Sequence, residues 1–185
     1  PDGSHQQFMI AQGPQLFPKV PDLTLEAAGS YMLNLGTIYR ALFTTLKIQA
    51  GKTLFIEGAA TGTGLEVVKA ASKNGVHVTG LVSSTDRAQV VRQNGAVGAI
   101  NRREKDLESL FTKVPEDESL WAAWEKAGEK ILSKYREQNH DHLADYSISH
   151  AGETSFPRSF QLLAKDGILT FYGASTGYHF TFMGK

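Results

Sequence analysis

Residues 52–68 read KTLFIEGAATGTGLEVV, and the fold depends on this stretch. It opens with an apolar run from Leu54 to Ile56, which has the length of a buried strand. A glycine-rich turn follows, and Leu65 and Val68 then recur at helical spacing. The first turn of a helix has free N–H groups and the positive end of the helix dipole. A strand, a glycine turn and a helix in this order therefore predict a site for the phosphates of a nucleotide.

The glycine turn from Ala60 to Gly64 is expected to approach a pyrophosphate through its backbone. Gly62 and Gly64 have no side chains that would prevent this, and Thr63 lies between them. The strict pattern Gly-x-Gly-x-x-Gly is not met, because Val67 stands where a third small residue is usual. A glycine-rich turn in another α/β protein, such as a methyltransferase that binds S-adenosylmethionine, is therefore the alternative interpretation.

The composition excludes several classes of site. Lys plus Arg and Asp plus Glu balance at 19 each, so no net charge favours binding to nucleic acid or to an anionic membrane. No apolar run has the length of a membrane span, and no secretory signal is recognisable. Cys is absent, which excludes disulfides, zinc thiolates and a catalytic thiol. These absences fit a cytoplasmic protein, which we predict. The two histidines of the run 140–142 lack the third ligand that catalytic zinc requires, so we predict no metal site.

Residues 1–23 carry four of the six prolines, and we predict that they are the tail of a truncated catalytic domain with a short strand at 7–10. A helix is predicted over 25–47, with Asp22 or Thr24 as its cap. The chain is expected to be a piece of a larger multidomain polypeptide, because a strand-like run begins at 180–182 near its end. Homo-oligomerisation of that parent is a further expectation.

Residues 24–185 alternate between strand and helix patterns. The fold class that this rhythm predicts is α/β, a Rossmann-type, doubly wound parallel sheet of five or six strands with helices on both faces. A charged helical insertion, packed over the edge of the sheet, is predicted near 102–142. Ligands of such sheets bind at the carboxyl ends of the strands. The predicted strands are 53–57, 76–82, 97–100, 143–149 and 168–172, and the other helices are 63–74, 85–94 and 153–165.

The end of the second predicted strand distinguishes NADP from NAD. An NAD site usually has Asp or Glu there for the ribose 2′-hydroxyl, but this strand is followed by Ser83 and Ser84. The two serines can donate hydrogen bonds to a 2′-phosphate, and Arg87 can pair with it. Asp86 would favour NAD if it reached back, but it suits the first turn of the next helix. We therefore predict NADP(H), with helix capping as the alternative role of the serines.

The chain resembles the medium-chain dehydrogenases/reductases in several runs of its sequence. The runs 24–33 and 36–42 are similar to the helix before the cofactor site of these enzymes, and 58–64 resembles the glycine turn of their quinone-reductase-like branch. Thr61 departs from that branch, which usually has Gly at this position. Three features resemble crotonyl-CoA carboxylase/reductase and the acryloyl-CoA reductase part of propionyl-CoA synthase: the run 98–103, the Trp-bearing insertion and the run 149–157.

The resemblance implies an NADPH-dependent reductase of a short α,β-unsaturated acyl-CoA, whose acyl-CoA partner is held mostly by the missing catalytic domain. His150 matches the His that helps to hold CO2 in the carboxylating members, and it is our candidate catalytic residue. A substrate contact, a remnant of the CO2 site and a cap of the strand end are its alternative roles. Ala60 to Gly64 would hold the pyrophosphate, and Ser83, Ser84 and Arg87 the 2′-phosphate. The remaining expected cofactor contacts are Thr37, Asn101, Gly152, Gly173, Ala174 and Ser175.

Two other functions stay open at this point. A quinone or simple enone reductase would share the same fold, although the insertion and the His150 segment speak against it. A non-catalytic nucleotide-binding module is equally compatible with a chain whose reacting residues lie elsewhere.

Overall fold

The computed structural model describes residues 7–181, and the chain divides into two compact units at Leu33/Asn34. Between residues 7 and 33, the first unit contains the 3-10 turn Gly13–Gln15 and the first part of helix α1 (Leu25–Tyr39). Thr24 caps this helix, since its hydroxyl accepts a hydrogen bond from Ala27 N at 3.2 Å. The predicted strand at 7–10 is wrong: this segment is extended or bent and pairs with no strand in the described part of the unit.

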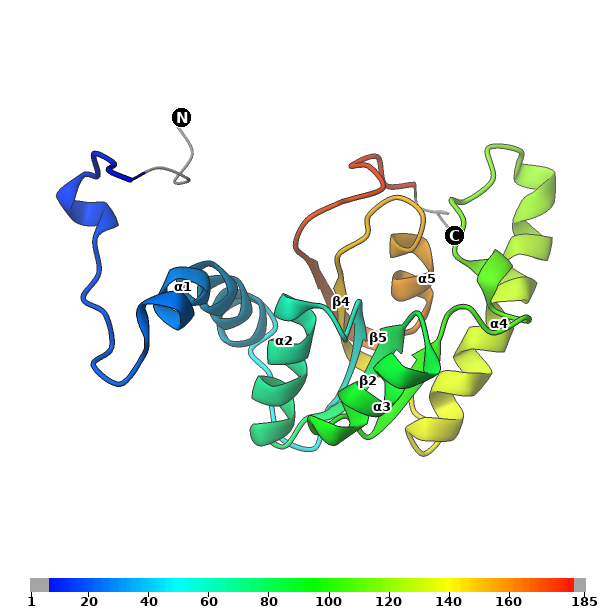
Figure 1. The fold of residues 1–185 in the computed structure, drawn as a ribbon. Helices are drawn as coiled ribbons and strands as arrows, with labels where there is room; N and C mark the ends of the chain where they lie inside the picture. Colours follow the sequence, from blue (N-terminus) through cyan, green and yellow to red (C-terminus); the bar gives the residue numbers. More distant parts are fainter. Residues whose placement is uncertain (1–6, 182–185) are drawn as a thin grey trace. The chain divides into compact units, whose positions relative to one another are not determined.

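The second unit is built on five parallel strands in the order β3-β2-β1-β4-β5 (Figure 1). The central strand β1 pairs with β2 on one side and β4 on the other, so the chain reverses its winding there. This sheet confirms the predicted fold class. Its strands are β1 (Thr53–Glu57), β2 (His77–Val82), β3 (Gly98–Asn101), β4 (Ala144–Ser149) and β5 (Leu163–Phe171).

Helices cover both faces of the sheet, because neighbouring residues of each strand point to opposite sides. On one face, Leu54 and Ile56 of β1 pack with α2 (Gly62–Lys73), α3 (Thr85–Gln93) and the π-helical segment η2 (Arg40–Thr45) that follows α1. On the other face, Phe55 packs with α4 (Trp121–Gln138). The sheet is therefore buried on both sides, as a doubly wound sheet requires.

Helix α4 is the crossover from β3 to β4. Its apolar stripe, which includes Ile131 and Tyr135, lies on the face of the sheet over Phe55 rather than over an edge, where the sequence led us to expect it. The rings of Phe55 and Tyr135 meet edge to face with centroids 5.9 Å apart. Two 3-10 turns, Glu108–Leu110 and Glu118–Leu120, precede α4 within the segment predicted as an insertion. The residues around them are irregular.

Helix α5 (Phe156–Gln161) is much shorter than the predicted helix 153–165. Ala144 N donates to Leu162 O at 2.9 Å, and this bond draws the chain into the sheet directly after the helix. A bulge then sets the register of β5 against β4, and Asp166 adopts a φ of 65° there. Tertiary pairing thus overrides the helical pattern of residues 162–165.

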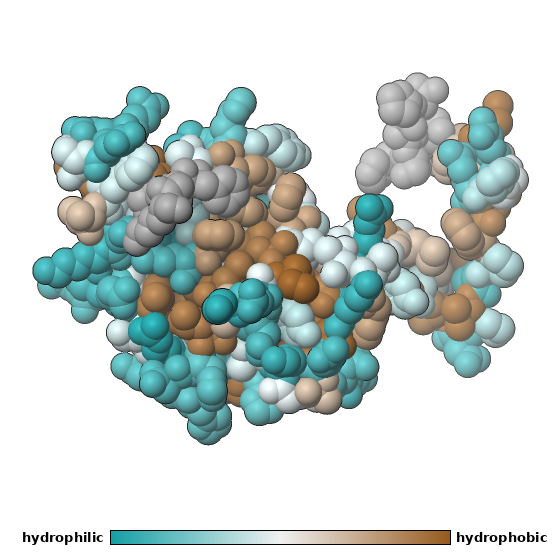
Figure 2. Space-filling model, turned by 180° about the vertical axis from the view of Figure 1, so that it is seen from behind, coloured by the Kyte–Doolittle hydropathy of each residue, from teal (hydrophilic) through white to brown (hydrophobic). Residues whose placement is uncertain are grey.

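Strand β5 forms one edge of the sheet and leaves Ile168 and Phe171 exposed. Viewed from behind, apolar side chains gather on the central part of the second unit (Figure 2). The strand-like run 180–182 shows no strand at 180 and 181, and residue 182 lies outside the described residues. No helix among residues 7–181 is long and apolar enough to cross a membrane.

Candidate nucleotide-binding site

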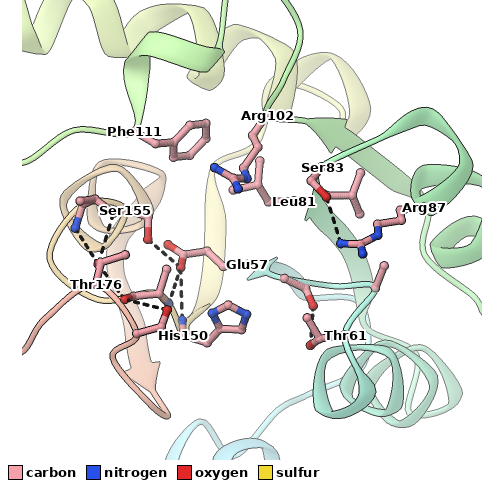
Figure 3. Close-up of a pocket in the computed structure, with 16 residues that line it drawn as sticks. Glu57, Thr61, Leu81, Ser83, Arg87, Arg102, Phe111, His150, Ser155 and Thr176 are labelled. Carbon is pink, nitrogen blue, oxygen red and sulfur yellow. Dashed lines mark hydrogen bonds between the residues drawn. The ribbon is translucent and has the colours of Figure 1, made fainter.

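A pocket opens where strands β1, β2 and β4 end, at the point where the winding of the sheet reverses (Figure 3). Crevices at this position are where doubly wound sheets bind nucleotides. One wall comes from the ends of β1 and β2, and the other from the segments after β4 and β5. Six of the residues predicted from the sequence line it: Ala60, Thr61, Ser83, Arg87, His150 and Ser175.

Thr61 shapes the turn between β1 and α2. Its extended backbone makes it the cap of α2, where its hydroxyl donates to Gly58 O at 2.8 Å and accepts from Gly64 N at 3.2 Å. A residue in this role needs no glycine conformation, which explains how Thr replaces the usual Gly. Among the described residues, nothing accepts a hydrogen bond from the N–H groups of Gly62 and Thr63. These two donors are free at the start of α2, directly after Thr61, which lines the pocket.

The remaining parts of the turn are set by close packing. A Cβ on Gly64 would lie 2.2 Å from Gly58 O, so the approach of α2 to β1 requires glycine there. Gly62 has open space around it, which a ligand can use. The Thr63 hydroxyl donates to Asn34 Oδ1 at 2.8 Å. The Thr63 side chain therefore joins α2 to α1. Only the backbone N–H of Thr63 remains for the predicted contact with a pyrophosphate.

The end of β2 carries the predicted 2′-phosphate group. Arg87 donates to Ser83 Oγ at 3.0 Å, and both residues line the pocket. Ser84 lies just outside it and caps α3, because its hydroxyl accepts from Arg87 N at 3.3 Å. Asp86 is exposed in the first turn of α3 and does not line the pocket. A serine and a guanidinium, with no acid, therefore face the site at this strand end.

Arg102 and Phe111 also line the pocket, and the sequence analysis missed both as site residues. They come from the segment after β3, the next strand end along the sheet. The predicted contact Asn101 does not line the pocket, since its side chain accepts from Arg103 N at 3.1 Å and closes a local turn. The position after a strand end was the available signal for Arg102, whereas Phe111 lies in an irregular stretch with no such signal.

Glu57, the last residue of β1, is 2% exposed and was not predicted as a site residue. Its carboxylate joins β1 to the end of β4 and to α5 (Figure 3). Oε2 accepts from two backbone N–H groups and two hydroxyls, and Oε1 accepts from a third hydroxyl. These donors are His150 N, Ala151 N, Ser149 Oγ, Ser155 Oγ and Ser159 Oγ. The turn that carries His150 is therefore held by a buried carboxylate.

His150 stands between two hollows. It lines the main pocket and also a second, shallower hollow with Gly173, Ala174, Ser175 and others. Its imidazole passes over Gly58, where a Cβ would lie 2.2 Å from Nε2. Two polar atoms here, His150 Nδ1 and Tyr172 Oη, are buried and have no hydrogen-bond partner among the described residues. Burial, with a contribution from the Glu57 charge, raises the pKa of Tyr172 to about 12.

A third group of contacts fixes the wall made by residues 173–179. The carboxylate of Glu153 accepts from His179 N at 3.0 Å and pairs with Lys113, and these partners lower the pKa of Glu153, the Lys113 hydrogen bond most. Thr176 donates to Ala151 O at 2.8 Å. Gly152 is buried behind this wall with a φ of 98° and lies outside both hollows, as does Thr37 in α1. The other predicted residues that line neither hollow are Gly62, Thr63, Gly64, Ser84 and Asn101.

Comparison with known proteins assigns the family. Residues 62–183, about two thirds of the chain, match the model of the family described as zinc-binding dehydrogenase. The chain belongs to the zinc-binding dehydrogenase family. The expected relationship to the medium-chain dehydrogenases/reductases is thereby confirmed. Residues 7–181 contain no group of three or more His, Cys, Asp and Glu side chains placed to hold a metal ion.

Two similar curated proteins are longer than this chain. Crotonyl-CoA carboxylase/reductase of Cereibacter sphaeroides is 30% identical in an alignment 185 residues long, which covers 98% of this chain and 43% of the relative. Quinone oxidoreductase of Mus musculus is 28% identical over 102 residues, which are 55% of this chain and 31% of the relative. The chain spans less than half the length of these relatives.

Solved structures agree with this placement in the zinc-binding dehydrogenase family. A crotonyl-CoA carboxylase/reductase in complex with NADP superimposes with a TM-score of 0.77 at 26% identity, covering 83% of this chain and 38% of that one. A 2-octenoyl-CoA carboxylase reductase in complex with NADP and 2-octenoyl-CoA gives a TM-score of 0.76 at 27% identity, covering 91% and 37%.

The pocket fits such a dinucleotide in its chemistry. The free N–H groups of Gly62 and Thr63 suit a pyrophosphate, and the Ser83–Arg87 pair suits a phosphate on a ribose. The unpartnered His150 Nδ1 and Tyr172 Oη suit the polar carboxamide of a nicotinamide. Each part of the cofactor thus has partners of matching chemistry around the site.

Proposed function

We propose that this chain is the NADPH-binding part of an enoyl-CoA reductase, which transfers a hydride to the β-carbon of a short α,β-unsaturated acyl-CoA such as an acryloyl or crotonyl ester. The observation that carries the proposal is the Ser83–Arg87 pair at the end of β2, where an NAD site has an acid. Relatives named as crotonyl-CoA enzymes, and neighbours solved with NADP, support it.

In this proposal, NADPH supplies the hydride when it is bound, and the chain positions and surrounds it. The N–H groups of Gly62 and Thr63 donate to the pyrophosphate. Arg87 and Ser83 hold the 2′-phosphate, and Ser84 supports them by capping α3. Addition of hydride to the β-carbon leaves an enolate, whose α-carbon then takes a proton.

His150 faces the part of the pocket beside β4 and β5. Its imidazole is fixed by packing over Gly58 and by the Glu57 hydrogen bonds to its backbone. We assign it a contact with the substrate or with the nicotinamide end of the site. Ser175 and the neighbouring Gly173 and Ala174 complete this side.

The acyl-CoA specificity rests on the breadth of the match. The crotonyl-CoA relative aligns over 98% of the chain, including the segment before α4, whereas the mouse quinone oxidoreductase aligns over 55%. Most of the acyl-CoA pocket would belong to the remainder of a larger, multidomain and homo-oligomeric parent. We also propose that the chain is similar to the acryloyl-CoA reductase part of propionyl-CoA synthase. A quinone or enone reductase is the second candidate, because relatives of that name share the same fold.

Calorimetric titration with NADP+ and NAD+ tests the cofactor assignment. We expect NADP+ to bind about tenfold or more tightly than NAD+, a difference of about 1.4 kcal/mol, and Arg87→Ala to abolish this preference. Arg92→Ala is the matched control, since Arg92 is also exposed on α3 but does not line the pocket. Equal or tighter binding of NAD+ would identify Asp86 as the ribose ligand and overturn the assignment. If neither binds, S-adenosylmethionine is the next ligand to test.

The reaction is tested on the full-length parent. We expect it to oxidise NADPH with acryloyl-CoA or crotonyl-CoA and to be slower by more than about tenfold in kcat/KM with simple quinones. Faster turnover of quinones would favour the second candidate. Absence of NADPH oxidation with any of these acceptors would favour a non-catalytic nucleotide-binding module.

A further inference from the structure

Glu57 stands out because it is a buried acid that forms no ion pair within residues 7–181, although Arg87 and Arg102 line the same pocket. Its carboxylate is 2% exposed, and all five of its hydrogen bonds come from neutral donors. Among residues 7–181, no Lys, Arg or His side chain forms an ion pair with it. Both oxygens of a carboxylate accept hydrogen bonds and neither donates, so these five donors suit a negative charge beside the pocket.

The other buried acid at this end of the sheet differs in that respect. Glu153 is 6% exposed, but its charge is compensated by Lys113. Buried charges in proteins are usually paired in this way, because removing an ion from water is costly. The neutral donors around Glu57 lower that cost without cancelling the charge. Its field therefore extends to neighbouring groups, and the raised pKa of Tyr172 records part of this effect.

Glu57 lies on the side of the pocket where we expect the nicotinamide half of the cofactor. A dinucleotide lies across the point where the winding of the sheet reverses, with one nucleotide on each side. The Ser83–Arg87 pair assigns the 2′-phosphate half to the β2 side. The nicotinamide half then lies on the side of β4 and β5, where Glu57 bonds to the backbone of residues 150 and 151. The nicotinamide ring is positively charged in NADP+ and neutral in NADPH.

We propose that Glu57 makes the site discriminate between the two redox forms of the cofactor, by stabilising the positive ring of NADP+ relative to NADPH. This inference rests on the proposed function. Loss of a hydride, two electrons and one proton, converts the neutral ring to the cation, and the electron pair passes to the β-carbon of the substrate. Tighter binding of the oxidised form makes bound NADPH a stronger hydride donor. Glu57 is thus a positioning and specificity-determining residue that acts through its charge.

The test is a set of dissociation constants for NADP+, NADPH and 2′-phospho-ADP-ribose, which lacks the nicotinamide ring. Opposite charges within about 10 Å in a partly buried site change an affinity by about tenfold. We therefore expect wild type to bind NADP+ about tenfold more tightly than NADPH. Glu57→Gln should remove this preference by weakening NADP+ alone, with 2′-phospho-ADP-ribose unchanged. The control Glu66→Gln removes an exposed charge that is paired with Lys69 at 2.6 Å, and it should behave as wild type.

Three outcomes would overturn the inference. The first is an unchanged ratio of the two dissociation constants in Glu57→Gln. The second is an equal loss of affinity for all three ligands, which would show a purely structural role. The third is that wild type binds NADPH as tightly as NADP+. This measurement needs no variant, so it applies even if Glu57→Gln does not fold. Failure of wild type to bind either cofactor would instead contradict the proposed function itself.

Discussion

Asp145 and Glu57 are two carboxylates that bridge the same pair of strands, β1 and β4, at opposite ends. Asp145 is near the start of β4 and accepts from Thr53 N at 2.9 Å and from Lys52 Nζ at 2.9 Å. Its side chain is 31% exposed, and its charge is paired. Glu57 is buried, receives five hydrogen bonds from neutral donors, and faces the pocket. The same strand pair thus has a paired, partly exposed acid at the end away from the pocket and a buried acid without an ion pair at the pocket.

The difference teaches which end of the sheet is built for stability and which for a ligand. Ligands of doubly wound sheets bind at the carboxyl ends of the strands. An acid that only joins two strands has a small desolvation cost when it stays partly in water and pairs with a lysine, as Asp145 does. Keeping an unpaired charge buried is costly, and that cost is accepted at functional sites. The predictions below separate the two roles.

Replacing Glu57 with Ala should have the largest effect. The substitution leaves five donors without an acceptor in a buried place and opens a cavity, so we expect the free energy of unfolding to fall by about 3–5 kcal/mol. Urea denaturation followed by circular dichroism measures this. A loss below about 1 kcal/mol would show that water replaces the carboxylate, as at an exposed site, and would remove the contrast with Asp145.

A buried cation extends the comparison. Arg158 in α5 is 1% exposed, donates to Leu110 O and Trp124 O at 2.9 Å each, and lies 3.5 Å above the Trp124 ring. Burial lowers its pKa to about 10. We expect Arg158→Met to lower the free energy of unfolding by about 2–4 kcal/mol, because it removes the guanidinium hydrogen bonds to two buried carbonyls and the contact with the Trp124 ring.

Arg136→Met is the control for that measurement. Arg136 lies in α4, is partly exposed and contacts Glu129 at 3.8 Å, so its loss should change stability by less than about 0.5 kcal/mol. Equal effects of the two substitutions would show that the buried contacts of Arg158 add nothing to stability.

The turn between β1 and α2 separates packing from ligand binding. Gly64→Ala places a methyl group 2.2 Å from Gly58 O, and we expect a loss of about 1–3 kcal/mol in the free energy of unfolding. Gly62→Ala meets no atom within 4 Å and should leave stability within about 0.5 kcal/mol of wild type. Thermal unfolding without cofactor compares the two, and the reverse order would contradict the packing role of Gly64.

Apart from the controls Arg136→Met and Gly62→Ala, Asp145→Asn should have the smallest effect, about 1 kcal/mol at pH 7. Burial alone would raise the pKa of Asp145, but hydrogen bonds from Thr53 and Lys52 outweigh it and hold the pKa below its ordinary value. A lowered pKa in the folded state stabilises the protein above the unfolded pKa of about 3.9. The difference between wild type and variant should therefore shrink as the pH falls below about 4. A difference that persists in acid would contradict this account, and NADP+ affinity should not change.

Local patterns were enough to predict the exposed side of the site. Ser84 as a cap of α3 and Arg87 one turn later follow from a few adjacent residues. The role of Thr61 as the cap of α2 was not predicted. The order of strands and helices followed in the same way. The length of α5 did not, because pairing of Ala144 with the chain after the helix decided it.

The buried side of the site depends on contacts between distant parts of the chain. Glu57 meets donors that lie 92 to 102 positions further along, so no local pattern indicates them. Phe111 reaches the pocket from an irregular segment, and that segment is fixed in place by the hydrogen bond from Arg158 to Leu110 O. A glutamate at the end of a buried strand, followed directly by the glycine turn, was the one available signal.

A crystal structure of the chain with NADP+ tests the central claim most directly. The account predicts the 2′-phosphate within hydrogen-bonding distance of Ser83 and Arg87, the pyrophosphate at the N–H groups of Gly62 and Thr63, and the nicotinamide ring on the side of Glu57 and His150. A cofactor bound in the reverse direction, or one that leaves the end of β2 without a phosphate, would contradict it.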